Sequence, residues 1–206
     1  MNTEIGLRFT LNHEFAYSRL AIGLVHRPFS ISKPGTIVPY FIRKVTKSYW
    51  NHCCLLMKMD GKWFVLEADT PRVHMIPLSA YEDTKLIEVF PLEYSSPETA
   101  MSLHELQTKA MSAIYKVKYS LADLLWFMPI SIATRKFYGK KYESFANKMT
   151  CYEYVAWVLS LENWYKMTPN QFQSHINKMI SDRKNGIICY RMGVYQSATL
   201  KSLLNQ

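Results

Sequence analysis

One dipeptide, Asp60-Gly61, constrains the fold more than any other part of the sequence. It separates two apolar runs, Asn51–Met59 and Trp63–Ala68. Asp-Gly is among the strongest short signals for a tight β-hairpin, because a type I′ turn needs a positive φ at both central residues. The sequence therefore predicts two antiparallel strands joined by a two-residue turn.

This turn also predicts which side chains lie together. With Asp60 and Gly61 at its centre, the register places His52 opposite Asp69 and Cys54 opposite Glu67. Side chains alternate between the two faces of a sheet, so these four residues share one face. Glu67 is a diagonal neighbour of His52, with backbones about 7–8 Å apart, a distance that long side chains bridge.

The shared face makes His52 a candidate general base. A carboxylate that bonds to an imidazole orients it and holds it in one tautomer, as a general base requires. We expect Glu67 to be that acid, with Asp69 as the substitute if the register differs. The alternative is that His52 is an ordinary histidine at a strand end, satisfied by a nearby backbone group.

Further strands are predicted on both sides of the hairpin. They cover Leu20–His26, Val73–Pro77, Leu86–Phe90 and, near the end of the chain, Ile187–Met192. The second and third of these are expected to continue the hairpin as an antiparallel meander, in a barrel-like sheet. Ser30–Gly35 is typical of a turn, and Val38–Thr46 fits either a short helix or an extended run.

The pattern changes to helical spacing after residue 95. Helices are predicted over Ser96–Lys116, Ser120–Phe127, Cys151–Leu161 and Pro169–Ser181. Strands followed by helices indicate the α+β class. We expect one domain over residues 1–206, with a core at about 20–180 and a C-terminal tail at about 186–206.

Cys151 stands at the start of one predicted helix. Thr150 and Glu153 have the spacing of a capping box, Thr-x-x-Glu, directly before the apolar run Val155–Leu159. The unpaired N–H groups and the dipole of a helix N-terminus favour negative charge, which lowers a thiol pKa. The same N–H groups can hold an oxyanion. Cys151 is therefore the candidate nucleophile; the alternative is a small buried hydrophobic residue.

The other three cysteines, Cys53, Cys54 and Cys189, lie in predicted strands and are expected in the core. No CxxC pair and no disulfide framework is present in the sequence. A metal site built from His52, Cys54, Glu67 and Cys151 lacks the usual ligand spacing. We therefore expect no metal and no cofactor.

Charge and hydropathy limit the partners. The net charge is +9, from 25 Lys and Arg against 16 Asp and Glu. This excess favours contact with phosphate, an anionic membrane surface or an acidic polymer, without choosing among them. The basic residues are scattered, so no specific nucleic-acid contact is predicted, and the sequence does not indicate an oligomeric state.

No signal peptide is recognised at the N-terminus. The longest apolar stretch, Leu121–Ala133, contains Asp123 and Pro129 and is too short for a bilayer span. A cytoplasmic location is the default expectation. The same stretch is either a core helix or part of an acyl-binding wall.

Three segments of the chain resemble a known family. They are Ser48-Tyr49-Trp50-Asn51-His52, Gly61-Lys62-Trp63-Phe64-Val65-Leu66-Glu67-Ala68 and Cys151-Tyr152-Glu153-Tyr154-Val155-Ala156-Trp157. In order and spacing they resemble the circularly permuted NlpC-type papain-like hydrolases, above all the YaeF/YiiX-like permuted amidases. These are relatives of a poxvirus protein and of lecithin:retinol acyltransferase. In them the histidine strand precedes the cysteine helix, the reverse of papain.

The resemblance covers roughly residues 20–180 and implies roles for individual residues. His52 matches the base, Glu67 the orienting acid and Cys151 the nucleophile. Tyr119 matches a tyrosine that members carry near the site, and Thr150 and Tyr152 are expected to line it. The chain departs from the family pattern in three places. The Gly-Asp of the first strand is absent, Cys53-Cys54 replaces a Val-Gly-like pair after the histidine, and bulky tyrosines follow the nucleophile.

Together these features predict a cysteine amidase or peptidase that acts through a thioester acyl-enzyme. The resemblance implies a cell-wall peptide or a lipid amide or ester as substrate. Two alternatives stay open: acyl transfer by the same three residues, and a catalytically silent papain-like protein used for binding or structure.

Overall fold

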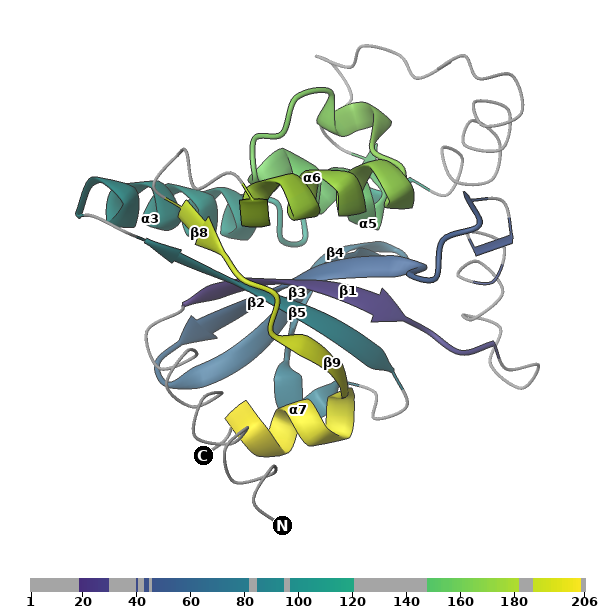
Figure 1. Cartoon of the computed structure of the whole chain (residues 1–206), viewed down its shortest axis with the longest axis horizontal. Helices are drawn as coiled ribbons and strands as arrows, with labels where there is room; N and C mark the ends of the chain where they lie inside the picture. The colour runs from purple at the N-terminus through teal and green to yellow at the C-terminus, as the bar shows by residue number, and fades with distance from the viewer. Residues whose placement is uncertain are drawn as a thin grey trace.

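The computed structural model describes residues 19–29, 40, 43–44, 46–81, 85–94, 97–120, 148–181 and 187–204. Within them, one open and mostly antiparallel sheet of nine strands is covered by helices (Figure 1). The strands are β1 (Leu20–His26), β2 (His52–Met59), β3 (Lys62–Asp69), β4 (Arg72–Pro77), β5 (Leu86–Tyr94), β6 (Lys118–Tyr119), β7 (Lys148–Met149), β8 (Ile187–Cys189) and β9 (Gly193–Gln196). The helices are α3 (Pro97–Ser112), α5 (Cys151–Val158), α6 (Pro169–Ser181) and α7 (Ser197–Leu204), with short 3-10 helices η2 (Leu78–Ala80) and η4 (Trp164–Lys166). The predicted α+β class is confirmed.

The β2–β3 hairpin forms as the sequence predicts. Asp60 and Gly61 adopt φ values of 48° and 76°, the positive values that a type I′ turn needs. Met59 pairs with Lys62, and the ladder continues in the predicted register as far as Leu55 with Leu66.

Both faces of the sheet are buried. Helices α3, α5 and α6 cover one face, and α7 lies on the other (Figure 1). Alternate residues of β1 and β2 enter two separate cores, which explains their nearly continuous apolar sequences. The helix-side core includes Leu20, Ile22, Leu24, Cys53, Leu55, Met57, Val155 and Phe172. The second core includes Ala21, Val25, Cys54, Leu56, Val65, Tyr81, Ile87 and Leu200.

The meander prediction is wrong for its last strand. The order of the sheet is β7-β6-β4-β3-β2-β1-β5-β8, with β9 also on β5, so β5 pairs with β1 and not with β4. The segment after α3 occupies the outer edge of β4, where Val73 N–H donates to the carbonyl of Val117 and Tyr115 N–H to that of Val73. The chain therefore crosses the second face through η2 before it forms β5. Among the described strands, the two ends of this order do not pair with each other, so the sheet is open and not barrel-like.

Several element boundaries differ from the predictions. Helix α3 ends at Ser112 because the chain then turns along β4. Helix α5 ends at Val158, where Ser160 takes a left-handed φ of 55° and Leu161 N–H donates to the carbonyl of Ala156, a Schellman-type end. Strand β5 is longer than predicted, and β8 stops at Cys189, after which β9 and α7 follow. Helix α6 has the predicted bounds.

Some predicted segments lie outside the described residues. They are Ser30–Gly35 and Leu121–Ala133, together with nearly all of the helix predicted over Ser120–Phe127. Of the segment Val38–Thr46, residues 40, 43, 44 and 46 are described and are helical. No helix in the described ranges combines the length and apolar character that a membrane span needs.

Gly23 of β1 provides a test of how tightly the second core is packed. An added Cβ would lie 2.7 Å from Cys54 Sγ and 3.2 Å from Ile87 Cγ2. Overpacking of this kind costs about 1–3 kcal/mol, so Gly23→Ala should lower the free energy of unfolding by that amount in urea titrations. Because Cys54→Ala removes the clashing sulfur, the double variant should lose less stability than the two single variants together. Strictly additive losses would contradict this packing.

Candidate active site

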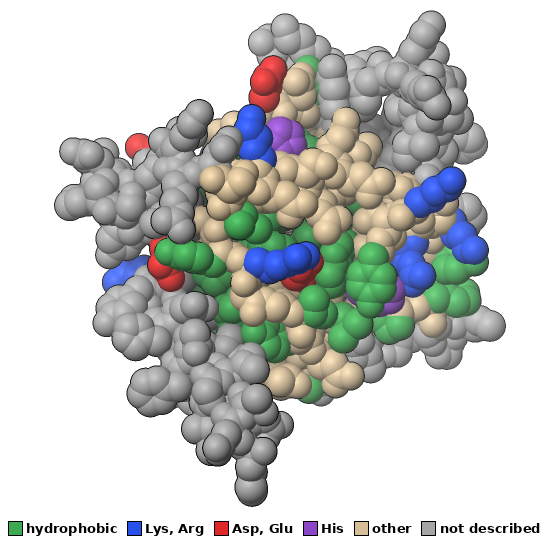
Figure 2. Space-filling view, viewed as in Figure 1, with side chains coloured by type: hydrophobic (Ala, Val, Ile, Leu, Met, Phe, Trp, Pro, Cys, Tyr) green, Lys and Arg blue, Asp and Glu red, His purple; other side chains and the backbone are tan. Residues whose placement is uncertain are grey.

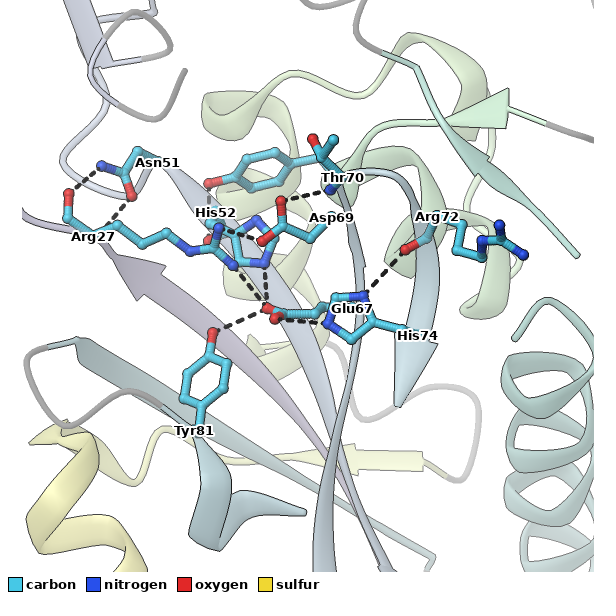
Figure 3. Close-up of polar contacts among 10 residues, drawn as sticks. Arg27, Asn51, His52, Glu67, Asp69, Thr70, Arg72, His74 and Tyr81 are labelled. Carbon is cyan, nitrogen blue, oxygen red and sulfur yellow. Dashed lines mark hydrogen bonds and ion pairs between the residues drawn. The ribbon is translucent and has the colours of Figure 1, made fainter. Parts of the chain in front are cut away.

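Polar side chains from several elements meet at one end of the sheet (Figure 3). His52 is the first residue of β2, and Glu67 and Asp69 lie near the end of β3. Arg27 directly follows β1. All but Asp69 are nearly or completely buried: Arg27 is 9% exposed, His52 3% and Glu67 2%.

The backbone around His52 is held from two sides. Asn51 bonds reciprocally to Arg27: the Arg27 N–H donates to Asn51 Oδ1 at 2.8 Å, and Asn51 Nδ2 donates to the Arg27 carbonyl at 2.9 Å. On the other side, the Tyr152 hydroxyl of α5 lies 3.1 Å from the Trp50 carbonyl and 3.3 Å from the His52 carbonyl. These contacts tie the end of β1, the start of β2 and the first turn of α5 together.

The β2–β3 ladder ends where the site begins. Its last pair is Leu55 with Leu66, and beyond it the two strands are connected by side chains. His52 Nε2 lies 2.6 Å from Glu67 Oε2, so the contact between these two residues that the register predicted is present.

Glu67 is the most heavily bonded group in the site. Its Oε2 also accepts from Arg27 Nη2 at 3.0 Å and from the Tyr81 hydroxyl at 3.0 Å, while His74 Nε2 lies 3.5 Å from Oε1. Burial disfavours the charged carboxylate. The positive charges of Arg27 and His52 and the hydrogen bonds from both histidines outweigh that penalty, and the pKa of Glu67 lies well below its usual value.

Asp69 is bonded to Arg27 and not to His52. Its Oδ2 accepts from Arg27 Nη1 at 2.6 Å, and its Oδ1 accepts from the Thr70 N–H at 2.7 Å. Arg27 therefore bridges the two carboxylates with its two terminal nitrogens. Glu67 holds the position expected of the orienting acid, and Asp69 lies one step further out.

Cys151 is the first residue of α5 and is fully buried. The capping box is present: Thr150 N–H donates to Glu153 Oε2 at 2.8 Å, and the Thr150 hydroxyl accepts from the Glu153 N–H at 3.4 Å. Burial raises the pKa of Cys151. Hydrogen bonds from the thiol and N–H of Cys53 and the charge and hydrogen bond of His52 act more strongly, so the net pKa lies well below the usual 9.0.

His52 shows the complementary shift. Burial and the positive charge of Arg27 lower the pKa of His52. The negative charges of Cys151 and Glu67 and the hydrogen bond to Cys151 raise it by more. The net pKa of His52 is raised. With a thiol pKa lowered and an imidazole pKa raised, the pair favours a thiolate beside an imidazolium.

Tyr119 lies beside the cysteine. Strand β6 runs parallel to β7, Tyr119 pairs with Met149, and the Ser120 N–H donates to the Met149 carbonyl at 3.0 Å. Burial raises the pKa of Tyr119 well above its usual value, and the negative charge of Cys151 adds to this effect. The structure thus brings Tyr119 to the residues that open α5.

Thr150 and Tyr152, the other two residues expected to line the site, both lie at the N-terminus of α5. Thr150 is the buried N-cap of α5, and Tyr152 is also buried, with its ring edge-on to that of Phe172 at a centroid distance of 5.6 Å. The hydroxyl of Tyr152 positions the backbone of His52. Among the described residues, no three His, Cys, Asp or Glu side chains are arranged to hold a metal ion.

Sequence reasoning missed three residues of the site: Arg27, His74 and Tyr81. Each contacts Glu67 (Figure 3). His74 is paired with Glu67 across β3 and β4, so the hairpin signal extended to the next strand would have found it. Arg27 and Tyr81 lie at the ends of β1 and η2, and no short-range pattern predicts where those ends lie in space.

Replacing Arg27 tests its electrostatic role. Arg27→Met replaces the buried guanidinium with an uncharged side chain of similar length, so Glu67 and Asp69 lose their shared positive partner. The free energy of unfolding should therefore fall by about 3–5 kcal/mol. The loss of positive charge beside His52 should also raise the pKa of that imidazole, measured by NMR titration. Arg72→Met, at an exposed arginine of β4, is the matched control and should change neither quantity appreciably. An unchanged His52 pKa in Arg27→Met would contradict the assigned role.

Acid unfolding tests the buried carboxylate. A group whose pKa is depressed in the folded state stabilises it above the unfolded-state pKa, and that stabilisation is lost as pH falls through the folded-state pKa. For Glu67 the loss should therefore begin near its usual value of 4.5 and continue below it. Glu67→Gln should flatten this part of the curve of unfolding free energy against pH. Glu162→Gln, at an exposed carboxylate, should reproduce the wild-type curve; equal slopes in all three proteins would contradict the shift.

Comparison with known proteins does not assign the chain to a family. No protein-family model matches the sequence, and no curated protein matches it either.

Proposed function

We propose that the chain is a cysteine hydrolase in which Cys151, His52 and Glu67 act as nucleophile, base and orienting acid. One observation carries the proposal. The imidazole of His52 bonds to Glu67 Oε2 at 2.6 Å and interacts with the sulfur of Cys151, which opens a capped helix. Nucleophilic acyl transfer requires this arrangement, in which a thiolate contacts a histidine and a carboxylate holds that histidine in place.

Each residue has a defined part in the reaction. The Cys151 thiolate attacks the acyl carbon of the substrate, and the backbone N–H groups at the first turn of α5, which have no acceptor within the helix, stabilise the oxyanion. His52 gives a proton to the leaving amine or alcohol, which departs and leaves a thioester on Cys151. The neutral imidazole then takes a proton from water as the oxygen of that water attacks the thioester. The acid product leaves, and the thiolate of Cys151 and the imidazolium of His52 are restored.

Arg27 supports this chemistry without contacting the reacting atoms. It holds Glu67 ionised, and Glu67 in turn orients the His52 ring and stabilises the imidazolium. Arg27 is thus a positioning residue.

The fold supports a permuted papain-like assignment for this hydrolase. Two adjacent antiparallel strands carry His52 and Glu67, and a later helix carries Cys151 and packs on the same sheet. This order matches the family that the sequence resembles. The substrate class that follows from the likeness is a cell-wall peptide or a lipid amide or ester, and product analysis separates hydrolysis from transfer to another acceptor.

The acyl-enzyme is the direct test. With p-nitrophenyl acetate as probe, wild-type protein should gain the mass of one acetyl group, located on Cys151 by peptide mapping. Cys151→Ala should gain none, and His52→Gln and Glu67→Gln should form or lose the adduct about 10²- to 10⁴-fold more slowly. Cys189→Ala and His175→Gln are matched controls outside the site and should behave as wild type. Labelling on another cysteine, or equal rates in all variants, would refute the proposal.

Full burial of Cys151 favours one competing function, a silent fold used for binding. Iodoacetamide labelling of the native protein at neutral pH separates the two. Catalysis requires local opening that exposes a reactive thiolate, so Cys151 should be modified ahead of Cys53 and Cys54, and His52→Ala should abolish the preference. Modification of Cys151 only after unfolding would favour the silent fold.

A further inference from the structure

A basic pocket lies on the segment that leads into His52 and is not used by the proposed reaction. Its volume is about 340 Å³, and its lining residues are Tyr40, Arg43, Lys44, Lys47, Ser48 and Tyr49. Three of these six carry positive charge and none is acidic. On the face shown in Figure 2, Lys and Arg side chains gather beside a histidine and hydrophobic side chains at the right of the view.

The walls of the pocket are fixed by contacts outside it. His26 stacks on Tyr49 with ring centroids 4.5 Å apart, and its Nδ1–H donates to the Tyr49 carbonyl at 3.0 Å. In that tautomer His26 Nε2 accepts from Arg43 Nη1 at 3.3 Å. Tyr49 also meets the buried Trp50 edge-on at 4.9 Å. One arginine and one aromatic wall are therefore held before any ligand arrives, which reduces the entropy lost on binding.

The segment that contributes Lys47 and Ser48 to the pocket is tied to helix α6. Asn170 of α6 donates to the carbonyl of Thr46 at 2.9 Å, and the Thr46 hydroxyl accepts from the Ser48 N–H at 3.2 Å. Lys47 between them has a left-handed φ of 54°. The segment from Thr46 to Ser48 is thus fixed through both its backbone and its side chains.

The hydroxyl of Ser48 has no partner in the part of the chain that the structure describes. Ser48 is 7% exposed, and its Oγ is buried. A buried hydroxyl without a partner destabilises the folded state, and natural structures seldom tolerate one without a reason. A donor in this state, beside three cations, points to an acceptor that enters from outside.

We propose that this pocket binds a phosphate group. Phosphate presents several acceptor oxygens and more than one negative charge, which matches an arginine, two lysines and a hydroxyl better than a single carboxylate does. The volume lies at the lower end of the range for small-molecule sites, so it holds a phosphate together with an attached group against the rings of Tyr40 and Tyr49. The site is independent of the Cys151 chemistry.

Calorimetric titration of the full chain with inorganic phosphate tests the site. Binding should be saturable at one site per chain and should weaken as salt rises, because part of the attraction is screened. The triple variant Arg43→Gln, Lys44→Gln, Lys47→Gln should raise Kd at least about tenfold. The triple variant Lys62→Gln, Lys116→Gln, Lys178→Gln removes the same charge, from +9 to +6, at exposed positions and should stay within about twofold of wild type.

A single variant separates the built site from general electrostatics. Ser48→Ala leaves the net charge unchanged, yet it should raise Kd about tenfold because one charge-assisted hydrogen bond is lost. Its thermal midpoint should be equal to or above that of wild type, since an unsatisfied buried hydroxyl is removed. A lowered midpoint would show that the hydroxyl has an internal partner and would contradict the argument from Ser48.

Vesicle sedimentation identifies the source of the phosphate. Vesicles of phosphatidylcholine with phosphatidic acid should retain wild-type protein, and those of phosphatidylcholine alone should not, if the phosphate belongs to a lipid. Calorimetric binding of inorganic phosphate without vesicle retention assigns a soluble phosphate. Equal losses in the two triple variants, or no saturable binding to either probe, would overturn the proposal, and neither result bears on whether Cys151 is acylated.

Discussion

The structure of the site depends on the buried carboxylate of Glu67. A charge this deep in a protein is tolerated only when it is paired and hydrogen-bonded. Here the donors come from four separate parts of the chain: the end of β1, the start of β2, β4 and the segment after η2. Satisfying one acidic group therefore fixes the relative positions of four segments that are distant in sequence.

The same carboxylate explains why the sheet can open at this end. The β2–β3 ladder stops at Leu55 and Leu66, and the side-chain contact between His52 and Glu67 takes over from it. The backbone N–H of Cys53 instead contributes a hydrogen bond to the sulfur of Cys151. Because Cys53 lies beyond the last pair of the β2–β3 ladder, its N–H is available to the Cys151 thiolate. The end of the ladder and the lowered pKa of this thiol are therefore connected.

How much the sequence predicts depends on how local each feature is. The hairpin, its register, the His52–Glu67 contact, the cap at Thr150 and helix α6 each follow from a few neighbouring residues, and the structure contains all of them. The position of β5 was mispredicted because an apolar strand carries no information about which sheet edge is free. Arg27 was missed for a related reason: its role depends on β1 lying beside β2, and that pairing is not encoded near Arg27.

The short parallel pair of β6 and β7 has a consequence for how such a chain can diversify. It brings Tyr119 and Met149 side by side, so the chain leaves the site and returns to it at one place. Changes in length or composition between these two anchor points need not move Cys151 or the strands that carry His52 and Glu67. Chains that differ only between these two points can therefore share the arrangement of Cys151, His52 and Glu67.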